Sequence, residues 1–213
     1  MEQLGPSLRS VQQDVAHLER RALLNVGEQA LSRLQAMHER HWLHLDVKPA
    51  NLLLPLASGP PHGDEGSEEG LSKDGSEEGC PTLHLIDFGL SRRWWDPRIR
   101  APVLFTPRRG AIGTVRFASI ANQQAEALGR RDDLESLVYT LLFLHHGELP
   151  WGSVQAPTKR ERFRLMLEVK MRLRVDELCV GLPPLATFLH TVRRLRPDEP
   201  PNYDLLRAIL RTL

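Results

Sequence analysis

The chain has 213 residues, of which 41% are hydrophobic and 26% are charged, a composition typical of a folded globular domain. Its formal net charge of +1 excludes a general electrostatic attraction to nucleic acid or to an anionic membrane, and we expect neither as a partner. Two cysteines, Cys80 and Cys179, are too few for a disulfide framework, and no apolar run reaches the roughly 20 residues of a transmembrane helix, so we expect a cytoplasmic or nuclear protein.

The first predicted element is a helix at residues 23–37. Apolar residues recur there every three or four positions, which is the spacing of one buried helical face. The next segment, Trp42–Asn51, contains Pro49, which disfavours a continuous helix. We therefore predict a loop that leads into a short strand at Leu52–Leu54.

Residues 55–81 differ from the rest of the chain. Gly-Ser-Glu-Glu-Gly occurs twice, at residues 66–70 and 75–79, and large apolar side chains are nearly absent. Such a composition cannot bury enough surface to offset the chain entropy of folding, so it predicts a disordered acidic insertion. Residues 82–86 then favour a second strand, which places the insertion in the turn of a β hairpin, where added length costs little.

The second half of the chain is predicted to be mostly helical. Residues 90–131 are polar and loop-like, whereas residues 133–144 are apolar almost all round, which predicts a buried central helix. Further helices are predicted at 158–174, 184–195 and 202–213, the last capped by Asp204 or Asn202. The predicted fold class is mainly α with a small β hairpin element.

Two motifs carry the chemistry of the sequence. His44–Asn51 and Asp87-Phe88-Gly89 match the catalytic-loop and metal-binding patterns of protein kinases. In phosphoryl transfer, the Asp46 carboxylate can orient a hydroxyl and accept its proton, while Lys48 can neutralise phosphoryl charge. Asn51 and Asp87 offer the hard oxygen ligands that Mg²⁺ prefers. Taken singly, each aspartate could also be a turn or strand-end residue, so the prediction depends on the combination.

A structural role is predicted for the histidine of the first motif. We expect His44 to pack beneath Phe88, in a stack that continues down to Asp133, rather than to act as a base.

Beyond these motifs, the chain resembles the casein kinase I family of serine/threonine kinases, with vaccinia-related kinases as more distant cousins. The segment Gly113–Ile120 is similar to the family's Gly-Thr-Ala-Arg-Tyr-Ala-Ser-Ile. Further matches, in order, are at Leu4–Leu8, Arg130–Leu137, Gly147–Trp151, Thr158–Arg160 and Asn202–Tyr203. The resemblance covers the chain except residues 55–81. It implies that residues 1–213 are a kinase C-terminal lobe that starts at the hinge, without an N-terminal lobe.

The resemblance implies a role for each matching residue. The catalytic residues would be Asp46 as base, Lys48 and Thr114. ATP would be bound by Glu2 and Leu4 at the hinge, Leu53 beneath the adenine, and Lys48, Asn51 and Asp87 at the phosphates, with Asn51 and Asp87 also holding Mg²⁺. Arg116 and Arg162 would form an anion patch that reads acidic or phosphorylated residues near the target serine or threonine of a protein substrate.

The sequence departs from the kinase pattern in two places. Leu45 stands where an arginine is usual, and there is neither a Gly-rich loop nor a lysine before Lys48. Two hypotheses follow for function. The chain either belongs to a serine/threonine kinase, here in a truncated, weak or inactive form, or it is a non-catalytic half-kinase that docks substrates or scaffolds.

Overall fold

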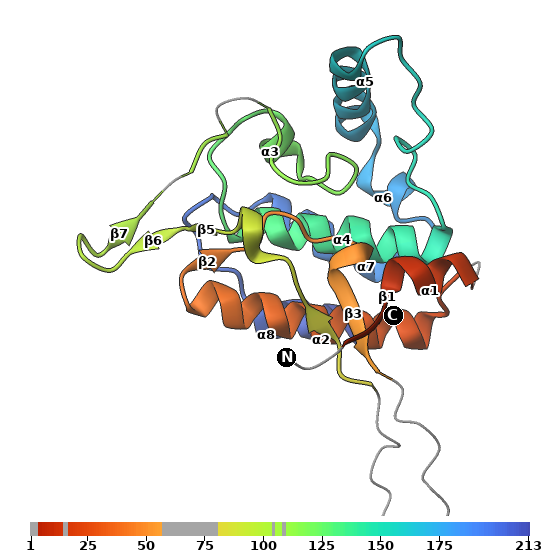
Figure 1. Ribbon diagram of the computed structural model, residues 1–213, viewed down its shortest axis with the longest axis horizontal. Coiled ribbons are helices and arrows are strands. Elements are labelled where there is room, and N and C mark those ends of the chain that lie inside the picture. Colours follow the sequence, from red (N-terminus) through yellow and green to blue (C-terminus); the bar gives the residue numbers. More distant parts are fainter. Residues whose placement is uncertain (1–3, 15–16, 57–80, 104, 108–109) are drawn as a thin grey trace, which may run out of the picture.

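The computed structural model describes residues 4–14, 17–56, 81–103, 105–107 and 110–213, and its arrangement is shown in Figure 1. Helices dominate, accompanied by small antiparallel sheets. In these ranges, no helix combines the length and the apolar character that crossing a membrane requires.

The largest sheet has three antiparallel strands in the order β1-β3-β4. These strands are β1 (Leu4–Ser7), β3 (Leu52–Pro55) and β4 (His84–Leu85), and the short helix α1 (Leu8–Asp14) follows β1 directly. Leu52 pairs with Leu85 and Leu53 with His84, which confirms the predicted hairpin. Most of the predicted insertion, residues 57–80, lies outside the described residues.

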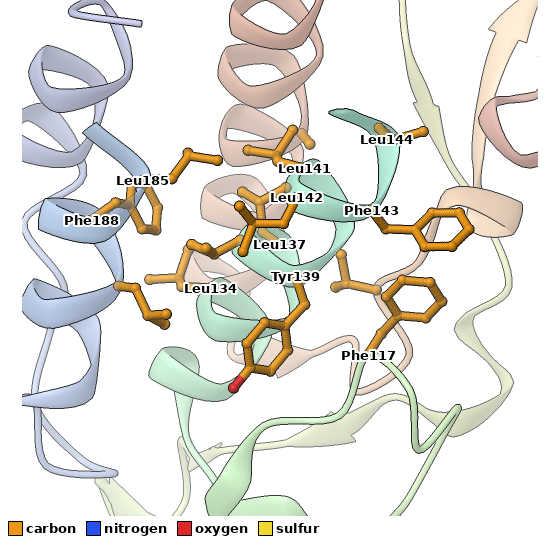
Figure 2. Packing of buried hydrophobic residues seen from close by; sticks show 14 of the residues in the cluster. Phe117, Leu134, Leu137, Tyr139, Leu141, Leu142, Phe143, Leu144, Leu185 and Phe188 are labelled. Atoms are coloured by element: carbon orange, nitrogen blue, oxygen red, sulfur yellow. The ribbon is translucent and has the colours of Figure 1, made fainter. Parts of the chain in front are cut away.

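The helix α4 (Arg130–His146) forms the centre of the molecule, and every residue from Asp132 to Leu144 is buried. It packs against α2 (Arg20–Glu39) and α7 (Pro183–Arg193), and α8 (Tyr203–Leu210) packs against both of these. Figure 2 shows Leu185 and Phe188 of α7 on one side of α4, with Phe117 and Phe143 together on the other. The predicted central helix and the helices predicted at 23–37, 184–195 and 202–213 are thus confirmed.

Three further helices lie above α4 in Figure 1, on the side opposite to α2 and α8. They are α3 (Ile120–Gln123), α5 (Lys159–Arg172) and α6 (Val175–Leu178). At the start of α8, the Asn202 side chain accepts a hydrogen bond from the Leu205 amide at 3.0 Å, so Asn202 is the cap. Asp204 instead pairs with Arg207, at 3.2 Å.

The polar segment before α3 has more structure than the sequence predicts. It contains the 3₁₀ helix η2 (Phe88–Leu90) and the strands β5 (Arg92–Arg93), β6 (Trp95–Asp96) and β7 (Ala101–Pro102). In the catalytic-loop segment, β2 (Trp42–Leu43) pairs with β5, and the 3₁₀ helix η1 (Pro49–Asn51) leads into β3. A two-residue strand leaves too little periodicity to be recognised in the sequence.

Candidate functional site

The catalytic-loop segment is anchored to the first turn of the central helix by Asp133. Its carboxylate accepts hydrogen bonds from the backbone amides of His44 and Leu45, both at 2.7 Å, and from His38 Nε2 at 2.9 Å. Burial alone would raise the pKa of Asp133, but the hydrogen bonds that its carboxylate accepts from the His38 ring and the His44 amide hold it below its usual value. Asp133 therefore fixes the backbone just ahead of Asp46.

The predicted stack is confirmed above this anchor. The His44 ring meets Phe88 edge to face, with ring centroids 5.6 Å apart, and His44 Nε2 lies 3.0 Å from the Ile86 carbonyl oxygen. His44 therefore connects the buried carboxylate of Asp133 to Phe88, the residue after Asp87. The catalytic-loop and metal-binding motifs thus share one support.

Three other predicted site residues bind the Asp46 carboxylate, which is almost fully buried. Its Oδ1 accepts the Thr114 amide at 2.8 Å, and its Oδ2 accepts Lys48 Nζ at 2.5 Å and Asn51 Nδ2 at 3.3 Å. Lys48 Nζ also donates to the Thr114 hydroxyl at 3.0 Å. This network fixes an acid, an ammonium and an amide in one small volume.

Gly113 has a structural role that the sequence did not reveal. Its φ of +77° lies in the region that glycine adopts without strain, and a Cβ there would stand 2.4 Å from the Leu45 carbonyl oxygen. The close approach lets the next residue, Thr114, reach Asp46. In the sequence, the only indication of this role was that a glycine directly precedes Thr114 in the segment Gly113–Ile120.

Leu45 occupies the position where kinases usually carry arginine. Its side chain is buried in a small apolar cluster with Leu43, Ala121 and Leu128, and Phe105 packs against that cluster. Its φ of +64° is held in place by the bond of its amide to Asp133. The departure from the pattern therefore replaces a charged side chain with an apolar contact.

Asn51 and Asp87 are the residues predicted to hold magnesium, and both carry oxygen atoms of the kind that Mg²⁺ takes as ligands. The Asn51 Nδ2 atom donates to the Asp46 backbone carbonyl at 2.9 Å, which turns the amide oxygen elsewhere, and Asp87 is exposed. The Ile86 amide donates to the Asn51 carbonyl at 3.0 Å and so connects the two candidate ligands. The described residues contain no group of three His, Cys, Asp or Glu that could hold a metal. Two oxygen ligands suit Mg²⁺, which keeps several waters and binds phosphate oxygens.

The structure locates two of the three residues predicted to contact adenine, Leu4 and Leu53. Leu4 and Leu53 lie on the neighbouring strands β1 and β3, where Leu4 pairs with Pro55 and Leu53 with Ser7. Both leucines are partly exposed, and Phe88 is 54% exposed. Glu2, the other predicted hinge residue, lies outside the described residues.

Arg116 and Arg162, the predicted anion patch, are both anchored at the turn Trp151–Gly152. Trp151 Nε1 donates to the Arg116 carbonyl at 2.7 Å, and Arg162 Nη2 donates to the Gly152 carbonyl at 3.4 Å. The Arg116 guanidinium lies 5.8 Å from the centroid of the Phe143 ring. The two arginines are thus held at one turn, and anion binding by them stays a prediction.

None of the known protein-family models matches this chain.

Proposed function

We propose that the chain is a catalytic-loop and metal-binding lobe of a serine/threonine protein kinase of casein kinase I type. The reaction is transfer of the ATP γ-phosphoryl group to a Ser or Thr hydroxyl of a protein. The observation that supports this most is the shared network of Asp46, Lys48, Asn51 and Thr114 around one buried carboxylate. Phosphoryl transfer depends on such positioning and on charge neutralisation.

Each residue of the network has a task in this reaction. Asp46, with both carboxylate oxygens held by donors, orients the incoming hydroxyl and accepts its proton. Lys48, which bridges Asp46 and Thr114, neutralises charge that builds up on the transferred phosphoryl oxygens. Asn51 and Asp87 would hold Mg²⁺, which when bound supplies positive charge to the phosphates.

The proposed substrates are proteins with acidic or phosphorylated residues near the target hydroxyl. Arg116 and Arg162 carry guanidinium groups, whose planar donors suit carboxylate and phosphate oxygens. Their anchoring at the same turn supports a joint role in reading such a residue.

Calorimetry of ATP–Mg²⁺ binding to the 213-residue chain tests this proposal. We expect saturable binding that Asp87→Ala abolishes and that the exposed-site control Asp204→Ala leaves unchanged. Transfer of phosphate to a peptide carrying a phosphoserine upstream of a serine should then be lost in Asp46→Asn. The proposal would be contradicted if Asp87→Ala bound ATP–Mg²⁺ as the wild type does, or if Asp46→Asn still transferred phosphate to the peptide.

A second candidate function is a docking module without catalysis. The observation that favours it is the exposure of Phe88, at 54%, together with the partial exposure of Leu4 and Leu53. Such apolar surface is typical of an interaction site. In this case the chain would bind the phosphoserine peptide equally well with and without nucleotide, and Arg116→Ala would weaken that binding.

A further inference from the structure

Lys170 of α5 is a buried lysine outside the residues assigned so far. It is 2% exposed, and its Nζ donates to the backbone carbonyls of Val115 at 2.8 Å and Ala118 at 2.6 Å. The rings of Tyr139 and Trp151 lie beside it, with centroids 5.3 Å and 5.1 Å from Nζ. Across the described ranges, no carboxylate forms an ion pair with it.

This arrangement is costly for the folded state. Burial lowers the pKa of Lys170 to about 7, although the negative charge of Glu135 opposes the change, and the positive charge of Arg193 adds to it. A buried ammonium group without a counter-ion disfavours folding unless its hydrogen bonds compensate. A residue that breaks a rule of stability in this way is expected to serve the site.

The two hydrogen bonds hold one short backbone segment, Thr114–Ala118. The carbonyl oxygen between them, that of Arg116, accepts the indole N–H of Trp151 at 2.7 Å. Within the segment, the Thr114 carbonyl accepts the Phe117 amide at 2.9 Å. Three of the five carbonyls are therefore fixed by side chains from outside the segment, two of them by Lys170.

The segment leads directly into the Asp46 network. At its first residue, the Thr114 amide binds Asp46 Oδ1 at 2.8 Å and the Thr114 hydroxyl accepts from Lys48 at 3.0 Å. The same segment carries Arg116, so its position also sets where that guanidinium lies.

We propose that Lys170 is a positioning residue, which holds the Thr114–Ala118 segment so that Thr114 orders Asp46 and Lys48 and Arg116 faces the substrate. The anchoring of the segment stands on the structure alone. Its consequence for catalysis rests on the proposed kinase function.

Amide hydrogen exchange of the 213-residue chain, without nucleotide, tests the anchoring directly. Lys170→Met keeps an unbranched side chain only one atom shorter and removes both hydrogen bonds. We expect the amides of Thr114 and Phe117 to exchange at least tenfold faster, because two charge-assisted bonds are lost. Amides of α4 should keep their wild-type rates. The control Arg172→Met changes an exposed residue of the same helix and should have no effect at either place.

Lys170→Gln serves as a milder variant, since it retains an N–H donor without the charge. Its Thr114 exchange rate should lie between those of the wild type and Lys170→Met. The proposal would be overturned if the exchange rate of the Thr114 amide were unchanged in both variants, or if amide exchange became faster by the same factor throughout the chain.

Phosphotransfer kinetics then test the catalytic consequence. We expect Lys170→Met to lower kcat at least tenfold while the KM for ATP changes less than threefold. The reason is that the substitution would disorder the network around Asp46 and leave the nucleotide contacts in place. An unchanged kcat with a faster Thr114 exchange would refute positioning for catalysis. A wild-type chain that transfers no phosphate would instead contradict the proposed function, while the exchange result still decides the anchoring.

Discussion

The backbone of Gly113 lies so close to Asp46 that a Cβ atom at position 113 would stand 2.8 Å from Asp46 Oδ1. Under the proposed function, we predict that Gly113→Ala lowers kcat about a hundredfold, because displacing the Asp46 carboxylate by a fraction of an ångström disturbs the alignment of the reaction. Gly181→Ala is the matched control. Gly181 has a φ of +79°, close to that of Gly113, but an added Cβ would meet nothing within 4 Å.

Both glycine variants should lose about 1–2 kcal/mol of stability from the unfavourable φ. Gly113→Ala should lose more than this, because its Cβ would also stand 2.4 Å from the Leu45 carbonyl oxygen, and it alone should lose activity. The measurements are urea unfolding and initial rates of phosphotransfer. Equal rates for the two variants would show that the contact between Gly113 and Asp46 is unimportant.

The Asp133 carboxylate accepts from two loop amides and from His38, so its charge stabilises the catalytic loop. We predict that Asp133→Asn lowers the free energy of unfolding by about 3–5 kcal/mol, because an amide offers one acceptor oxygen and leaves buried donors without partners. Urea unfolding at pH 7 measures this loss. Asp204→Asn, at a side chain that is 99% exposed, should change stability by less than about 0.5 kcal/mol.

Stability should rise with pH above neutrality because of Lys170. Its pKa is about 7 in the folded chain and about 10.5 for the free side chain, so the unfolded state binds more protons between these values. The free energy of unfolding from this group therefore increases from pH 7 to about pH 10.5. Urea unfolding at pH 7, 8 and 9 should show the rise in the wild type and a smaller slope in Lys170→Met. Parallel slopes in the two proteins would contradict the assignment.

Asp132 should have the opposite effect on the acidic side. Burial raises its pKa to about 7, despite hydrogen bonds from the Ser119 hydroxyl at 2.6 Å and the Gly129 amide at 2.7 Å. The folded state then binds more protons between pH 3.8 and pH 7. The contribution of Asp132 to the free energy of unfolding is therefore complete below pH 3.8 and is lost as the pH rises to about 7. The carboxyl carbon resonance of Asp132, followed by NMR, should titrate near pH 7 and not near pH 4.

The sequence predicted the features that depend on local pattern. Helices with a continuous apolar face, such as α2 and α4, were found because their periodicity extends over many residues. The hairpin around Leu52 and Leu85 followed from two short apolar runs. Asp46 and Lys48 were placed together because their spacing in one motif leaves little freedom.

Apart from the stack of His44 between Phe88 and Asp133, which the kinase motifs indicated, features that depend on distant contacts were mostly not predicted. The close approach of Gly113 to Asp46 joins residues 67 positions apart, and nothing in either neighbourhood requires it. The burial of Lys170 could have been suspected only from a lysine four residues after Met166, on the buried face of α5. Asn202 and Asp204 are both residue types that favour a helix cap, and residue type alone does not show that Asn202 binds the Leu205 amide.

The hairpin of β3 and β4 has a consequence for protein engineering. Leu52 and Leu85 stay paired although 32 residues separate them in the sequence, so the strands do not depend on a tight turn. Because the entropy of closing a loop grows only with the logarithm of its length, doubling the connection costs only about 0.6 kcal/mol. A fluorescent reporter or an affinity tag could therefore be encoded between β3 and β4, and its signal would follow the folded chain without an attachment at either terminus.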